Sequence, residues 1–217
     1  MTLAGDSITV TPGTGATVAT HTVSGKEHQV VMLARPDGQL EGSNPVYRLS
    51  IPSSAVGASK VHADLFNASG SGLTLRILSA YAFVDIDTAV TGTVGVELAL
   101  TRTTAVGTGG TAATNDGTSL SAATFAKFDT TSSGLPAQVT ARLNPAGGAT
   151  AGAWLGTRWV FTEETNAGTA INASQGAEFI RNNGAELLVR EGEGLRFVQG
   201  AVASVGSLTF EITFEVI

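Results

Sequence analysis

The sequence predicts an all-β fold: a jelly-roll-like antiparallel β-sandwich with a long Ala/Thr/Gly-rich insertion and an extended N-terminal β-arm. The final segment, SLTFEITFEVI, alternates apolar and polar residues with the period of a strand that buries one face. The 217 residues include 27 glycines, which suits many short strands joined by tight turns. Only one short segment favours a helix, and the chain is long enough to bury a core of its own.

We expect residues 1–50 to form an extended arm or outer strands, and residues 51–217 to form the sandwich. The first part contains two strand-like pieces, DSITVT and HQVVMLA, separated by glycine-rich turns. The motif RPDG, which begins at Arg35, is a strong turn signal. The segment THTVSGKEHQVV, which overlaps the start of the second piece, predicts a hairpin or strand pair.

Four strands are expected in the middle of the chain. Two of them lie near residues 60–66 and 73–84, on either side of a loop. In the next segment, TGTVGVELALTRT, alternate residues are apolar, so that one face of the strand covers a core. The fourth segment, WLGTRWVFTEE, carries both tryptophans. Strand alternation places Trp154 and Trp159 on opposite faces, with one of them in the core.

Residues 103–153 are dominated by Ala, Thr, Gly and Ser. Because large apolar residues are scarce there, this stretch cannot hold a separate core and is interpreted as a long insertion between sandwich strands. The segment LSAATFAKF, residues 120–128, is a short helix candidate, with Ser119 or Ser121 as its cap. Loops of this length are commonly functional, disordered or ordered by a neighbour.

The C-terminal third predicts a β-meander. Strands over 186–190 and 195–199 flank the sequence Glu-Gly-Glu-Gly, in which glycine supplies the positive φ angles that a hairpin needs. The last strand has one apolar and one polar face. Its apolar positions are Leu208, Phe210, Ile212, Phe214 and Val216.

Composition argues against several classes of partner. The formal net charge is −6 with only 12 Lys and Arg, so the clustered basic residues that bind nucleic acid are not expected. No apolar run approaches the length of a membrane-spanning helix, and we expect no membrane partner. Without cysteine, neither disulfides nor thiolate metal sites form. The sequon at Asn67 is interpreted as a chance match.

No complete catalytic or cofactor motif is found. The glycine-rich GTGGT lacks the Lys-Ser/Thr pair that ends a phosphate-binding loop. Asp85 and Asp87 share a strand face, a spacing that suits a cation, but a solvated turn is the preferred interpretation. The adjacent Glu163 and Glu164 point to opposite faces of a strand and cannot act as a glycosidase pair.

The remaining carboxylates and the histidines give no clearer site. Glu191 and Glu193 lie in a predicted turn and are expected to face solvent. The chain has three histidines, none of which stands beside a recognisable nucleophile or in a metal-binding motif: His21, His28 and His62. We therefore predict a protein that is not an enzyme and that binds no cofactor or metal.

Partner contacts are the better hypothesis. A chain of low charge density with an extended N-terminal segment offers strand edges that a partner can satisfy. The candidate interface residues are Lys26, Glu27, His28, Val30, Met32, Arg35, Trp154 and Trp159.

Three blocks of the sequence resemble one family. They are VTPGTGATVATHTVSGKEHQVVML followed by PDG, then NASGSGLTLRILSAYAF, then AVTGTVGVELALTRTTAVGTGGT. In this order they are similar to virion structural proteins of tailed bacteriophages and cover nearly half of the chain. No catalytic residue is carried over from that family.

The resemblance implies a capsid decoration protein, of the cement or head-fibre kind, that binds and stabilises the capsid exterior. It implies localisation to the virion after assembly in the host cytoplasm, with the major capsid protein or other virion proteins as partners. A homo-oligomer is expected, with a trimer favoured. The alternative is a tail or baseplate protein, or a receptor-recognising adhesin, which a solvent-facing Trp154 or Trp159 would favour.

Overall fold

The computed structural model describes residues 20–23, 26–29, 44–85, 94–115, 117, 121–146, 151–162, 176–180 and 186–217. The chain divides into two compact units, Met1–Ser43 and Asn44–Ile217. The division precedes strand β3, Val46–Ala55, so that residues 46–50 belong to the sandwich sheet.

The first unit contains an antiparallel strand pair. β1 spans Thr20–Val23 and β2 spans Lys26–Gln29, with Thr20 opposite Gln29 and Val23 opposite Lys26. The strand pair predicted for this segment is therefore confirmed.

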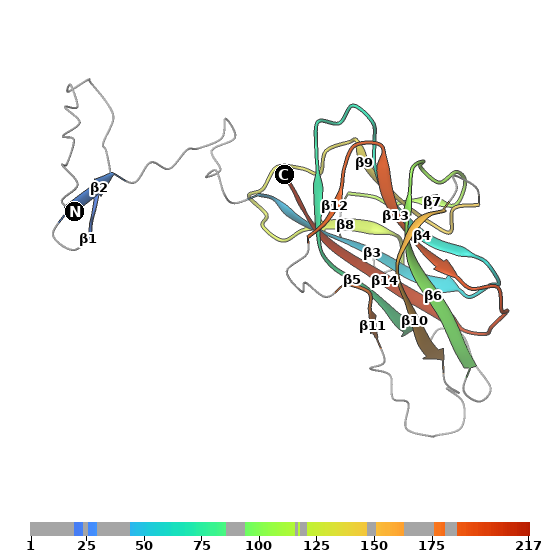
Figure 1. The fold of residues 1–217 in the computed structure, drawn as a ribbon. Helices are drawn as coiled ribbons and strands as arrows, with labels where there is room; N and C mark the ends of the chain where they lie inside the picture. The colour runs from blue at the N-terminus through green and yellow to red at the C-terminus, as the bar shows by residue number, and fades with distance from the viewer. Residues whose placement is uncertain are drawn as a thin grey trace. The chain divides into compact units, whose positions relative to one another are not determined.

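The second unit is built from two antiparallel sheets (Figure 1). In spatial order the first sheet contains β10 (Ala151–Thr162), β6 (Val94–Thr103), β13 (Glu193–Gln199), β4 (Val61–Asn67), β9 (Val139–Leu143) and β7 (Thr111–Ala112). The second contains β11 (Ala177–Glu178), β5 (Leu75–Asp85), β14 (Ser207–Val216), β3 and β8 (Thr124–Lys127), with β12 (Leu187–Val189) also beside β5.

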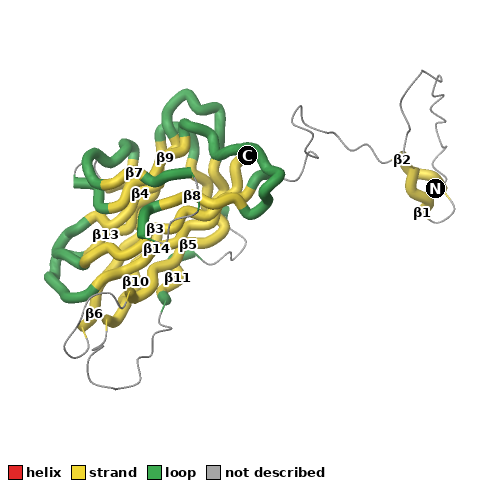
Figure 2. Tube along the Cα trace, turned by 180° about the vertical axis from the view of Figure 1, so that it is seen from behind, coloured by secondary structure: helices red, strands yellow, loops and turns green. Residues whose placement is uncertain are grey.

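The prediction of an all-β fold is confirmed, since Figure 2 shows strands and loops but no helix in the described part of the chain. Within that part, accordingly, no helix has the length and apolar character needed to cross a membrane.

The two sheets share one core because alternate residues of their strands point inward. On β14, Leu208, Phe210 and Phe214 are fully buried, as the alternation in the sequence predicted. The rings of Phe197 on β13 and Phe210 on β14 lie 4.7 Å apart, which joins the two sheets. The predicted apolar face of β6 is also buried, through Val96, Leu98 and Leu100.

The segment between β6 and β10 contributes strands to both sheets. β9 pairs with β4 in the first sheet, and β8 pairs with β3 in the second. The helix predicted over 120–128 is wrong, because this segment instead completes the edge of the second sheet. Phe125 of β8 is buried against Phe214, with 6.1 Å between the ring centroids. Pairing with β3 and burial of Phe125 thus outweigh a weak local helix propensity.

The hairpin predicted between residues 186–190 and 195–199 is also wrong. β12 pairs with β5 in the second sheet, whereas β13 pairs with β4 and β6 in the first. A turn does form, since the Glu193 N–H donates to the Arg190 carbonyl at 3.1 Å and Gly192 has a φ of 72°. The turn therefore carries the chain from one sheet to the other, and the C-terminal third is not a meander.

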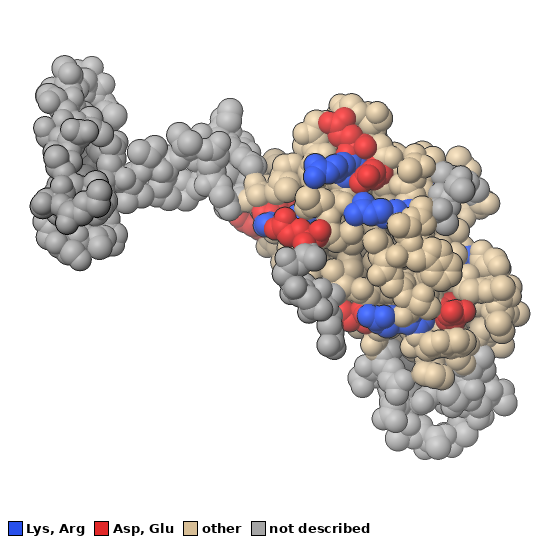
Figure 3. Space-filling model, viewed as in Figure 1, with Lys and Arg blue, Asp and Glu red and all other residues tan. Residues whose placement is uncertain are grey.

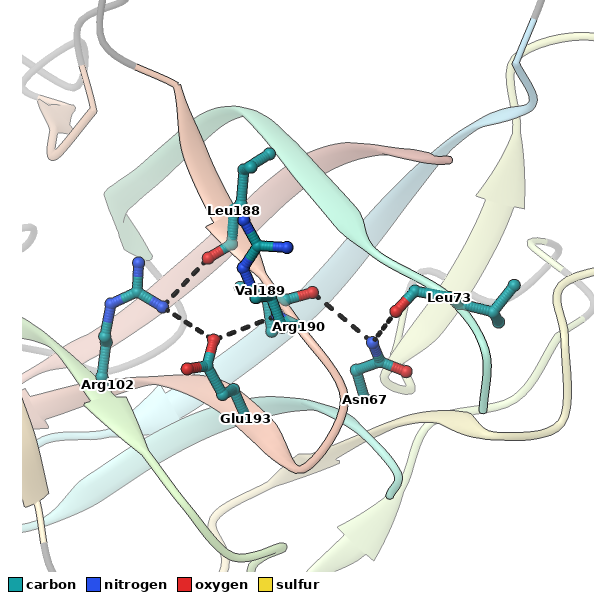
Figure 4. A network of polar contacts seen from close by, with 7 residues as sticks. All are labelled: Asn67, Leu73, Arg102, Leu188, Val189, Arg190 and Glu193. Carbon is teal, nitrogen blue, oxygen red and sulfur yellow. Dashed lines mark hydrogen bonds and ion pairs between the residues drawn. The ribbon is translucent and has the colours of Figure 1, made fainter. Parts of the chain in front are cut away.

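Polar contacts hold this crossover in place (Figure 4). The Arg102 guanidinium donates to the Leu188 carbonyl at 3.0 Å and to the Glu193 carboxylate at 3.1 Å. The buried Asn67 amide donates to the carbonyls of Leu73, at 2.9 Å, and Val189, at 3.4 Å. Arg102 and Asn67 of the first sheet are therefore bonded to the β12 segment of the second.

The two acidic residues of this turn are structural. Glu191 was expected to face solvent, and it is exposed, but its carboxylate accepts from the N–H groups of Gly70 and Gly72 at 3.0 and 2.9 Å. Glu193 is only partly exposed and bonds to Arg102 and to the Arg190 N–H.

We expect Asn67→Ala to lower the free energy of unfolding by about 1–3 kcal/mol, because it leaves the buried Val189 carbonyl and the partly buried Leu73 carbonyl without the Asn67 amide donor. Urea denaturation followed by circular dichroism measures the change. Ser69→Ala is the matched control, since Ser69 is exposed in the same loop. Equal stability of the two variants would contradict the role assigned to the Asn67 amide.

Candidate functional site

The two tryptophans lie on β10, the edge strand of the first sheet. Their register against β6 places Trp154 opposite Thr101, Trp159 opposite Glu97 and Phe161 opposite Gly95. These partners alternate with the buried Val96, Leu98 and Leu100, so they mark the outer face of the sheet. Both tryptophans therefore lie on the same outer face, which corrects the prediction of opposite faces.

A β-bulge causes this difference. The pairing shifts between Trp154 and Gly156, which lie opposite the neighbouring residues Thr101 and Leu100. One additional residue in β10 reverses the alternation. Trp154 therefore points to the same face as Trp159, whereas regular alternation would place it on the other face. The expectation that one tryptophan is in the core is also wrong, because Trp154 is 65% exposed and Trp159 is 56% exposed.

Small residues on β6 leave room for the aromatic rings. A Cβ atom at Gly95 would lie 3.2 Å from Cε3 of Trp159 and 3.4 Å from Cε1 of Phe161. Both rings therefore pack closely over Gly95, while Phe161 remains 43% exposed. We call Trp154, Trp159, Phe161, Gly95 and Ala99 the aromatic face.

A hollow of about 330 Å³ adjoins the aromatic face beside Trp154. Its lining includes Glu97 and Ala99 of β6, Val198 of β13 and the loop residue Gly200. The Gly200 N–H donates to the Glu97 carbonyl at 2.9 Å, which holds the loop after β13 against β6. The hollow therefore lies across β10, β6 and β13 on the outer face of the first sheet.

The loop after β13 adds exposed apolar groups next to this face. The Ser204 hydroxyl donates to the Gly95 carbonyl at 3.3 Å, and Val202 and Val205 are 69% and 50% exposed. Several exposed apolar residues on neighbouring elements are a candidate site of interaction, whereas single exposed apolar residues need no explanation. The arrangement offers ring stacking, apolar contact and one carboxylate.

A second hollow, of about 760 Å³, lies over β3, β14 and β8. Its charged lining is largely paired: Arg48 lies 4.0 Å from the Glu211 carboxylate and 5.1 Å from the centre of the Phe128 ring. Asp85 also lines it and accepts from the Thr209 hydroxyl at 3.2 Å. Arg48, Glu211 and Asp85 of the second hollow therefore already have partners within the sandwich.

The other predicted interface residues belong to the first unit. Lys26, Glu27 and His28 lie on β2, with His28 opposite His21. Val30, Met32 and Arg35 lie outside the described residues. Asp87, Glu163 and Glu164 lie outside them as well.

Sequence reasoning missed a buried polar cluster around His62. The imidazole is fully buried, with Nδ1 2.7 Å from the Ser54 hydroxyl and Nε2 3.2 Å from the Gln199 Oε1. Burial, followed by the charge of Lys60, lowers the pKa of His62 to about 4, against a smaller opposing effect of Gln199. His62 is therefore neutral at pH 7, and its buried ring is inaccessible to a substrate.

On the surface drawn in Figure 3, basic and acidic side chains stand side by side in small groups separated by uncharged surface. Among the residues that the structure describes, no group of three or more His, Asp or Glu is placed to hold a metal ion.

The chain matches no protein-family model, no curated protein and no solved structure. The aromatic face, together with its adjoining hollow, is therefore the candidate functional site on its own geometry. Of the residues predicted from the sequence, it contains Trp154 and Trp159. Phe161, Glu97 and the small residues beneath the rings were missed, although the alternation of glycine and alanine with large residues in VGVELAL is a signal for them.

Proposed function

We propose that this protein is a non-enzymatic structural component of a bacteriophage virion, a capsid decoration protein that binds and stabilises the capsid exterior. The division of the chain after Ser43 is the observation that carries this proposal. It assigns the candidate contacts on β2 to a small unit that is separate from the sandwich. The resemblance of three sequence blocks to virion structural proteins supports the same function.

We also propose that the sandwich is a jelly roll, an architecture found in viral capsid and lectin domains. The strand order supports this, since β3, β14, β5 and β12 are neighbours in one sheet and β4, β13, β6 and β10 in the other. In this interpretation β7, β8 and β9 form the insertion between the two neighbouring strands β6 and β10. Fold-level analogy of this kind supports a virion function only indirectly.

Attachment through many copies suits a decoration protein. A trimer presents three N-terminal units to the capsid, and linked weak contacts add up to firm binding. Lys26, Glu27 and His28 are the side chains that we assign to this contact.

Deleting residues 1–43 is expected to abolish binding to the capsid while the sandwich remains folded, because the core lies within Asn44–Ile217. Co-sedimentation with undecorated capsids measures binding, and circular dichroism measures folding. The full-length triple variant K26A/E27A/H28A tests the same contact without truncation. A deletion variant that binds capsids as well as the full chain would overturn the proposed attachment.

The second candidate is a tail or baseplate protein, or a receptor-recognising adhesin. The exposure of both tryptophans on one face is the observation that favours it, because exposed aromatic rings are suited to recognition. Locating the chain in electron-microscopy density of the intact particle separates the two candidates.

A further inference from the structure

We propose that the aromatic face and its adjoining hollow bind an extended, uncharged oligosaccharide. Sugar rings stack their C–H faces on Trp154 and Trp159, and a sugar hydroxyl donates to the Glu97 carboxylate. This inference concerns the sandwich alone and holds for either position of the protein in a virion.

The positions of the tryptophans indicate an extended ligand. Their partners on β6, Thr101 and Glu97, are four residues apart. At about 3.4 Å per residue, the backbone positions that carry the two indole rings are about 14 Å apart along the strand. A single sugar ring cannot contact both indoles across that distance, whereas an oligosaccharide lying along β10 contacts both.

Glu97 supplies the polar contact. It lies opposite Trp159 in the register and also lines the hollow beside Trp154. In the described part of the chain, its carboxylate forms no hydrogen bond or ion pair with another side chain. An ionised carboxylate accepts hydrogen bonds and donates none, so it matches a ligand that presents hydroxyl donors.

The charge of the hollow selects against anionic ligands. Glu97 is the one charged side chain among the described residues that line it. The neighbouring Gln199 is already engaged, since its Oε1 accepts from the Gly57 N–H at 2.7 Å and its Nε2 donates to the Val202 carbonyl at 3.1 Å. A phosphate or an acidic sugar would meet this carboxylate, and none of the described residues that line the hollow is a Lys or Arg, which favours a neutral chain.

Binding is tested by titrating the full-length protein with cellohexaose, chitohexaose, xylohexaose, mannohexaose and maltohexaose, and with glucose as the single-ring comparison. Isothermal titration calorimetry and tryptophan fluorescence are the measurements. We expect saturable binding of at least one hexasaccharide and at least about tenfold weaker binding of glucose, because one ring reaches only one indole.

Substitutions then locate the site. W154A and W159A are each expected to weaken binding about tenfold or more, with partial recovery in W154F and W159F, and E97Q is expected to weaken it less. The matched control is F128A, which removes an aromatic ring of the same 56% exposure as Trp159 from the other sheet. Thermal unfolding of each variant checks that the fold is retained.

The proposal is overturned if no hexasaccharide binds saturably, or if W154A and W159A bind as tightly as the unmodified protein. It is also overturned if these variants lose capsid binding or self-association while sugars do not bind, because the aromatic face is then a protein contact. Capsid co-sedimentation of the N-terminal variants is a separate readout, so failure of this proposal and failure of the capsid assignment are distinguishable.

Discussion

Lowering the pH from about 6.5 to 4 is expected to reduce the free energy of unfolding by up to about 3 kcal/mol through His62 alone. The pKa of His62 falls from 6.5 to about 4 on folding, chiefly because the imidazole is buried and secondly because Lys60 is nearby. In this pH range the unfolded chain binds a proton that the folded chain does not, so stability rises with pH. The contribution is complete above about pH 6.5 and is lost as the pH falls toward 4.

Urea denaturation at a series of pH values between 7 and 4.5 measures this dependence. His62→Gln is expected to flatten the slope, whereas the double variant H21Q/H28Q of the first unit is expected to retain it. Burial raises the pKa of Asp64, which adds stability as the pH falls and opposes the effect of His62. Asp64 is present in both the unmodified protein and His62→Gln. Subtracting the pH dependence of the variant's stability from that of the unmodified protein therefore cancels the contribution of Asp64. The same slope in both would contradict the assignment to His62.

Gly194→Ala is expected to destabilise the sandwich by about 3 kcal/mol or more, the upper part of the range for overpacking. A Cβ atom at Gly194 would lie 2.4 Å from the backbone oxygen of Leu65 on β4 and 2.9 Å from Cγ2 of Thr103 on β6. Because β13 lies between these two strands, it cannot move away from one without approaching the other.

Gly192→Ala is the matched comparison two residues away. Gly192 has a φ of 72°, and the nearest atom to an added Cβ is 4.0 Å away, so the cost is that of a left-handed residue, about 1 kcal/mol. Chemical denaturation of both variants measures the difference. A larger loss at Gly192 than at Gly194 would show that backbone conformation matters more than interstrand space in this turn.

These two glycines show where sequence reasoning succeeds and where it fails. The positive φ of Gly192 was predicted, because a turn between two strands needs such a residue. Gly194 was given the same role, yet its importance comes from the close approach of Leu65, which lies far away in the sequence. Local conformation is encoded locally, whereas close packing depends on which strands become neighbours.

The candidate site was predicted only in part. Trp154 and Trp159 were identified as contact residues, but their shared face depends on a bulge at one position of β10. Strand alternation carries no sign of a bulge, because the additional residue is accommodated by pairing with β6. The same pairing of β10 with β6 places Phe161 and Glu97 on the face that carries the two tryptophans.

The periodicity of the sequence by itself predicted the all-β fold and the residues of β6 and β14 that face inward. The reason is that a strand that buries every second side chain alternates apolar and polar residues. Tertiary structure decided which sheet receives β12 and β13, that residues 124–127 form an edge strand, and that both indole rings face outward. The physical reason is that backbone hydrogen bonds between strands are nearly independent of side-chain identity. Strand pairing is therefore settled by how the whole set of side chains packs between the two layers.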